Sequence, residues 1–142
     1  MTTAENTSQA ASFRAADKDL RELVGLWLVH LSGERRMAAL TLEGYGRDLR
    51  QFLDFLKDRT GEAIGLADLQ DLSQADARAF LATRRGEGAG SRSLLRGLAG
   101  IRSFLRFLER EGHAKIAAFD AVRTPKVARR LPKALSVGEA RD

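Results

Sequence analysis

Arginines recur at nearly every turn of one predicted helix in this 142-residue sequence. The stretch SRSLLRGLAGIRSFLRFLEREG begins at Ser91 and carries leucines and an isoleucine at steps of four, three, four and three. That spacing is typical of one buried helix face. The other side carries Arg92, Arg96, Ser103, Arg106 and Arg110, with Arg102 on a flank. A solvated helix usually mixes charge signs, whereas this one has no acidic residue before Glu109.

A row of arginines is suited to a polyanion. The guanidinium fork pairs bidentately with phosphate and with the O6/N7 edge of guanine. Ser91 and Ser93, at the start of the helix, can add hydroxyl and backbone N–H contacts to a phosphate. These residues predict a helix that lies against double-stranded DNA. The alternative interpretation is an ordinary solvated face, because basic helices are common.

No residue set points to catalysis or to a metal. The sequence has no cysteine, and its two histidines, His30 and His113, lack the spacing of metal ligands. The single tyrosine, Tyr45, falls on the apolar side of its predicted helix. Glycine-rich phosphate loops and nucleophile–histidine–carboxylate sets are absent from the sequence. The sequence therefore predicts a binding domain with no catalytic residue, no metal site and no cofactor.

The positive charge is localised. Residues 1–83 carry ten Lys/Arg and thirteen Asp/Glu, whereas residues 84–133 carry thirteen and four. Such asymmetry points to nucleic acid or to an anionic membrane. Binding to an anionic membrane is disfavoured because the sequence lacks the large exposed apolar face that it would need. The sequence also has no long apolar run and no signal peptide, and we expect a cytoplasmic protein.

The elements that position these residues are all predicted to be helical. Apolar periodicity predicts a helix over 17–31 and a second from an N-cap at Thr41 to Gly61. The second helix also presents Arg47 and Arg50, interleaved with acidic residues. A short helix follows at 66–71, and a Ser73–Asp76 capping box opens the next. Ser91 is predicted to cap the arginine-rich helix. Residues 115–122 are predicted to form a short final helical piece.

The predicted organisation has four parts. Residues 1–15 lack periodicity and are predicted to be a disordered, mobile tail. Residues 16–122 form a compact all-α bundle of four to five helices. Residues 123–135 read as a basic, extended interdomain linker. Residues 136–142 contain a capping box and are interpreted as the truncated start of a further domain, the alternative being a frayed tail that matches this four-residue pattern by chance.

Three stretches in this order resemble a known family: TLEGYGRDLRQFLDFL, SRSLLRGLAGIRSFLRFLEREG and TPKVARRLPKALSVGEA. Together they are similar to the N-terminal, core-binding domain of Xer-type tyrosine recombinases, more to the XerC branch than to XerD. The resemblance covers roughly residues 20–140. The glycines at 44, 46 and 100 depart from the more usual alanine or larger residue.

The resemblance implies a SAM-like bundle that forms one half of a C-shaped clamp around DNA. The helices matching Thr41–Lys57 and Ser91–Glu111 would lie against the duplex, which adds the first of them to the interface. Such recombinases cut DNA with a tyrosine in a C-terminal domain, need no cofactor, and resolve chromosome dimers at cell division. None of those catalytic positions occurs in this sequence, so the chain alone should be inactive. The implied partners are a DNA recombination site and a second recombinase in a tetrameric synapse.

The predicted DNA-binding residues are therefore drawn from the two basic helices: Thr41, Arg47, Arg50, Ser91, Arg92, Ser93, Arg96, Arg102, Ser103 and Arg106. The alternative function is a helical protein–protein interaction module whose basic face docks an acidic partner.

Overall fold

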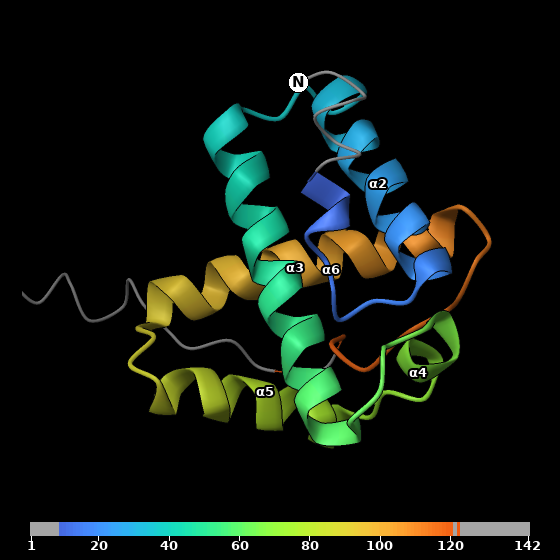
Figure 1. Ribbon diagram of the computed structural model, residues 1–142. Coiled ribbons are helices and arrows are strands. Elements are labelled where there is room, and N and C mark those ends of the chain that lie inside the picture. The colour runs from blue at the N-terminus through green and yellow to red at the C-terminus, as the bar shows by residue number, and fades with distance from the viewer. Residues whose placement is uncertain (1–8, 121, 123–142) are drawn as a thin grey trace, which may run out of the picture.

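The computed structural model describes residues 9–120 and 122, and within them the chain is helical. Five helices follow in order (Figure 1): α2 (Lys18–Gly33), α3 (Ala39–Thr60), α4 (Leu66–Gln70), α5 (Gln74–Gly86) and α6 (Ser91–Arg110). The described residues contain no strand, only an isolated parallel bridge between Ala16 and Ile64. The predicted all-α class is confirmed.

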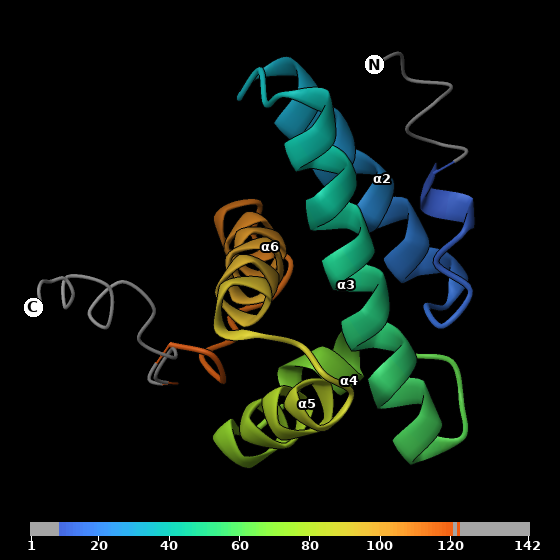
Figure 2. The same cartoon turned by 90° about the vertical axis from the view of Figure 1, so that its left-hand side faces the viewer.

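Helix α3 is the centre of the bundle. Figure 2 shows α2 and the N-terminal segment on one side of α3, and α6 with α5 on the other. The predicted stripe of α6 is buried throughout, and so is that of α3 apart from the half-buried Tyr45. Trp27 of α2 is fully buried, and its ring meets Phe104 of α6 edge to face at 5.3 Å. Burial of apolar surface stabilises a fold by about 25 cal/mol per Å², and it is the main force that holds these helices together.

The N-terminal segment is not a tail from residue 9 onward. Phe13 is fully buried in the core, and residues 9–11 form a helical turn. Asp17 N–H donates to the Ile64 carbonyl at 2.8 Å, and Ile64 N–H donates to the Ala15 carbonyl at 2.7 Å. The prediction of a disordered segment is therefore wrong for residues 9–15, because an apolar side chain and two backbone bonds fix it. Residues 1–8 lie outside the described part.

Two predicted helix starts are shifted. Helix α3 begins at Ala39, so Thr41 lies within its first turn and makes no cap hydrogen bond. Helix α6 has Gly90 as its N-cap, and Ser91 is its first residue. Ser73, by contrast, does accept from Asp76 N–H at 3.2 Å, which confirms that capping box. Gly61 ends α3 in the left-handed conformation, with φ of 79°, as a C-terminal glycine should.

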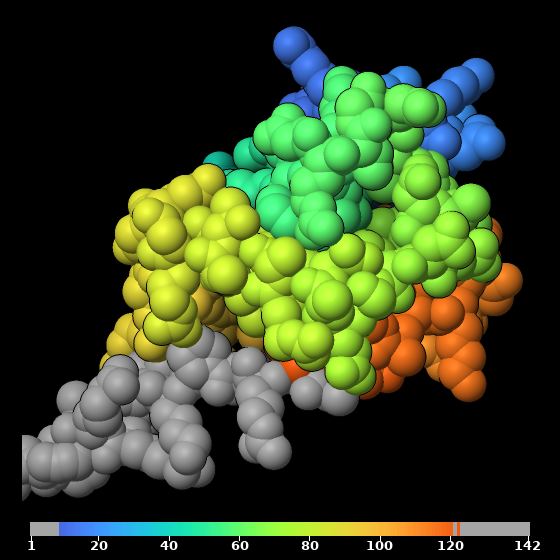
Figure 3. Space-filling view, turned by 90° about the horizontal axis from the view of Figure 1, so that it is seen from below, coloured from blue at the N-terminus to red at the C-terminus, as the bar shows by residue number. Residues whose placement is uncertain are grey.

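After α6 the chain returns along the bundle, and residues 111–120 and 122 form no further helix. Ile116 and Phe119 are buried, and residues 118–120 form a turn, so the helical piece predicted over 115–122 is wrong in the described part. Seen from below (Figure 3), this orange segment adjoins α4 and α5. The predicted linker and the 136–142 segment lie outside the described residues.

Candidate nucleic-acid interface

The arginines of α6 form one exposed row. Positions 92, 96, 99, 103, 106 and 110 advance by four or three residues and so share one face of the helix. The arginine stripe is our name for the four basic residues of this row: Arg92, Arg96, Arg106 and Arg110. All four are exposed, and no acidic residue occurs between Ser91 and Leu108. The prediction of a uniformly positive helix face is thus borne out by the geometry.

The stripe lies beside α3 because the two helices cross in close contact (Figure 1). Gly100 is buried at the crossing, and a Cβ placed there would lie 3.3 Å from the Cα and 3.4 Å from the carbonyl oxygen of Tyr45. A larger residue at 100 would have to push the backbones apart. The glycine that departs from the usual alanine therefore allows a close α3–α6 approach.

Arg96 is attached to α3 by an ion pair. Its Nε lies 3.1 Å from Asp48 Oδ2, and its NH2 group lies 3.4 Å from Oδ1. Asp48 is the buried charged side chain of the described core, 4% exposed, whereas the Arg96 side chain is 45% exposed. The fork is thus held on one edge by a carboxylate while the rest of the group faces solvent. The apolar spacing of α6 places Arg96 correctly on the exposed side, but it does not reveal this partner on α3.

Arg47 extends the basic surface from α3. Its NH2 atom lies 3.5 Å from the position of a Cβ at Gly44, and the Arg96 Cδ lies 3.9 Å from the same position. Both arginine side chains therefore lie over Gly44, which has no side chain of its own to displace them. Arg47 has no hydrogen-bond or ion-pair partner among the described residues, and neither has Arg92. Both guanidinium groups are available to a ligand.

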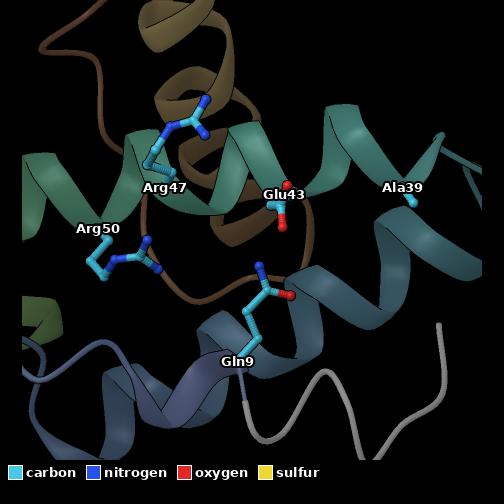
Figure 4. A pocket seen from close by; sticks show the side chains of 5 residues that line it. All are labelled: Gln9, Ala39, Glu43, Arg47 and Arg50. Carbon is cyan, nitrogen blue, oxygen red and sulfur yellow. The ribbon is translucent and has the colours of Figure 1, made fainter.

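Arg50 points elsewhere. Figure 4 shows that Arg50 points toward Gln9 whereas Arg47 points away from it. Arg50 NH1 donates to Ser12 Oγ at 3.3 Å, and its guanidinium lies 5.6 Å from the centre of the Phe13 ring. A cation over an aromatic face stabilises the packing of the N-terminal segment. Arg50 therefore holds residues 9–16 against α3, a role that its sequence position did not reveal.

Two further predicted contacts are used inside the domain. Arg102 donates to the Phe119 carbonyl from Nε at 3.2 Å and from NH2 at 2.8 Å, and NH2 also donates to the Val122 carbonyl at 3.0 Å. Its flank position on α6 aims it at the returning chain rather than outward. Ser103 Oγ accepts from Trp27 Nε1 at 3.0 Å. Arg102 is thus a tether for the C-terminal segment, and Ser103 is a bridge to α2.

The remaining predicted residues lie at the N-terminal ends of the two helices. Thr41 is exposed in the first turn of α3, while Ser91 and Ser93 are half-buried in the first turn of α6. Of the ten predicted positions, the structure brings Thr41, Arg47, Arg92, Arg96 and Arg106 to the surface along α3 and α6.

A second basic feature was missed in the sequence. A hollow of about 210 Å³ lies between α2, the loop after it, α3 and α6, and three arginines, Arg35, Arg106 and Arg110, line it. His30 and Tyr45 also line it. Arg110 donates to His30 Nε2 at 3.0 Å, so the other ring nitrogen carries the hydrogen and donates to Glu34 at 3.1 Å. His30 thus links α2 to α6 through Arg110. Only the fold could show that Arg35, from the loop after α2, also lines this hollow.

Nothing in the described residues suggests a metal centre, since they hold no group of three histidine, aspartate or glutamate side chains that could bind one. None of the described helices is long and apolar enough to cross a membrane.

Comparison with known proteins identifies the family of this chain. A family model described as phage integrase, N-terminal SAM-like domain, matches residues 24–112. The tyrosine recombinase XerC of Bradyrhizobium diazoefficiens is 50% identical over 127 residues, which is 89% of this chain and 40% of the relative. XerC of Methylobacterium nodulans is 53% identical over 122 residues, 86% of this chain and 38% of the relative. XerC of Rhizobium meliloti is 53% identical over 114 residues, 80% and 36% respectively.

The chain spans about two fifths of the length of the curated relatives it matches. No solved structure matches it. The resemblance to Xer-type recombinases, and to their XerC branch, is confirmed by these relatives. The chain belongs to the phage integrase N-terminal SAM-like domain family.

Proposed function

We propose that this domain is the DNA-binding half-clamp of a site-specific tyrosine recombinase. The observation that carries the proposal is the joint surface of α3 and α6, where Arg47, Arg92 and Arg106 have no partner among the described residues. Arginines fixed in a row on a helix neutralise successive phosphates, and their forks read guanine edges in the major groove. The relatives named XerC point to the same class of protein.

Each part of the surface has a distinct task in this proposal. Arg92 and Arg47, free and exposed, contact phosphates or base edges. Arg96 is held by Asp48, so its guanidinium group is already oriented on the protein surface before DNA binds. An arginine that is oriented in advance loses less side-chain entropy on binding. Arg96 is therefore the best candidate for reading a base.

The activity of the whole protein is also part of the proposal. Strand cleavage and exchange would be carried out by a catalytic domain that follows a linker at residues 123–135. A second recombinase of the same family would join it in a tetrameric synapse on DNA. The biological task would be the resolution of chromosome dimers at cell division in the cytoplasm. Without catalytic residues, this chain alone would bind DNA and leave it uncut.

The test is a titration of the chain against a recombination-site duplex and a scrambled duplex of equal length, at two salt concentrations. DNA binding by several arginines should weaken steeply as salt rises, because neutralised phosphates release counterions. Preference for the site duplex at the higher salt would support base reading. Arg92→Gln should weaken binding, while Arg78→Gln, an exposed α5 residue with no partner among the described residues, should not.

Absence of binding to either duplex at low salt would refute the proposal. The basic face would then be assigned to an acidic protein partner, the alternative function stated above.

A further inference from the structure

The basic hollow at the far end of the arginine stripe is built for an anion. Arg35, Arg106, Arg110 and His30 line it, and no acidic side chain does. It collects these groups from three separate parts of the chain: the end of α2, the loop that follows it, and α6. Its volume of about 210 Å³ leaves room for a phosphate group with its ester oxygens.

The groups in the hollow differ in how firmly they are held. Arg110 is fixed on both sides, by His30 Nε2 at 3.0 Å and by the Phe107 ring, whose centre lies 5.8 Å from its guanidinium carbon. The Arg35 and Arg106 side chains are exposed and have no hydrogen-bond or ion-pair partner among the described residues. One fixed and two free guanidinium groups thus converge on the same space.

Two hydroxyl groups complete the lining. The Tyr45 hydroxyl has no hydrogen-bond partner among the described residues. Ser103 Oγ accepts from Trp27, so its own hydrogen is free to donate. Glu34 and Glu111 lie outside the hollow, where they face His30 at 3.1 Å and Arg110 at 3.8 Å. The Arg35 and Arg106 guanidinium groups and the two hydroxyls are therefore available to one acceptor-rich group, whereas both His30 nitrogens are already bonded.

We propose that this hollow binds one backbone phosphate of the DNA duplex, held chiefly by Arg35 and Arg106. The inference rests on the proposed function, because Arg106 belongs to the arginine stripe and the hollow continues that row. A phosphodiester offers only acceptor oxygens, which matches a lining of donors. Contacts to phosphate set the register of a protein on DNA without reading sequence. The hollow is thus a fixed point beyond the α3–α6 crossing.

The experiment measures the dissociation constant of the full 142-residue chain for the site duplex and for the scrambled duplex over a series of salt concentrations. Arg35→Gln and Arg106→Gln are compared with Arg78→Gln, which removes the same charge from α5. Each hollow variant should weaken binding about tenfold at low salt, equally on both duplexes. Each should also lower the slope of log K against log salt by about 0.9 per lost phosphate contact. Circular dichroism should show unchanged folding, because both side chains are exposed.

The outcomes separate the two proposals. Binding by the unmodified chain, with hollow variants no weaker than Arg78→Gln, would overturn the phosphate site and leave the proposed function standing. A loss confined to the site duplex would also overturn it, because that pattern indicates base reading. A failure of the unmodified chain to bind any duplex would refute the proposed function and this inference with it.

A second arm distinguishes DNA from a free anion. Inorganic phosphate is titrated against the chain at constant ionic strength, with the Tm as readout. If phosphate raises the Tm of the unmodified chain but not of Arg35→Gln, and DNA binding is the same for both, the hollow takes a free anion and the proposal falls.

Discussion

The Asp48–Arg96 pair predicts an asymmetric response to mutation. Asp48 is 4% exposed, and its only partners among the described residues are the two guanidinium nitrogens of Arg96, whose side chain is 45% exposed. Removing the arginine strands a buried carboxylate, whereas removing the carboxylate leaves an arginine that can turn to water. The two single mutants should therefore differ although they break the same pair.

The magnitudes follow from burial. Arg96→Met keeps most of the aliphatic stem and leaves Asp48 uncompensated, which should cost about 3 kcal/mol. Asp48→Asn keeps the shape, and Arg96 retains a neutral acceptor, so its cost should be about 1 kcal/mol. The double mutant buries an amide instead of a charge. It should be more stable than Arg96→Met alone by about 1–2 kcal/mol.

The assay is urea denaturation followed by the fluorescence of Trp27, the single and fully buried tryptophan, with circular dichroism as a second probe. Free energies come from linear extrapolation. Arg92→Met is the matched control, since it lies one turn earlier on the same face without a partner among the described residues. It should change stability by less than about 0.5 kcal/mol.

The reasoning is refuted if Arg96→Met costs no more than Asp48→Asn, or if the double mutant shows the sum of the two losses. Additive losses would mean that the two side chains act independently. The result also bears on DNA binding. Any loss of affinity in an Arg96 variant must be measured well below its unfolding midpoint, because the same change destabilises the fold.

Further predictions concern the packing around the interface. Gly97→Ala should stabilise α6 by up to about 1 kcal/mol, since its Cβ would lie 3.9 Å from the nearest atom. Gly100→Ala should gain less or lose stability, because its Cβ would crowd the Tyr45 backbone. The midpoints of urea denaturation rank the two variants. Arg102→Met should cost about 1.5–3 kcal/mol because the Phe119 and Val122 carbonyls lose three hydrogen bonds, and hydrogen exchange should rise at residues 116–120. Phe13→Ala should cost about 3–5 kcal/mol in the same denaturation assay, and a cost near zero would restore the view of residues 9–15 as a tail.

The helices were predictable because their signals are local. The leucine spacing of α6, the Ser73 capping box and the glycine at 61 each depend on residues within a few positions of one another. The prediction for the N-terminal segment was wrong because the interactions that fix this segment are not local. Phe13 is buried and residue 16 bridges to Ile64, almost 50 residues later, and no periodicity within residues 1–15 carries that information.

The candidate site was predictable only in part. Periodicity shows which side of α6 an arginine occupies, and Arg92 and Arg106 are where it places them. It does not show which other element approaches that side. Arg102 and Ser103 are occupied by Phe119 and Trp27, and Arg96 is held by Asp48. These partners are set by tertiary packing, as is the gathering of Arg35 with α6.

The hydrogen bond from Trp27 to Ser103 spans 76 positions of the sequence. A ribosome that adds about 5–20 residues per second releases α2 and α3 several seconds before Ser103 emerges. Until then Trp27 has neither Phe104 nor Ser103 to cover it, and the two early helices expose the apolar faces that α6 will bury. The arrival of α6 therefore covers the apolar faces of α2 and α3, and the segment that holds Ile116 and Phe119 then completes the core. The basic surface and the packed core form together, because the helix that carries the arginine stripe is also the one that covers α2 and α3.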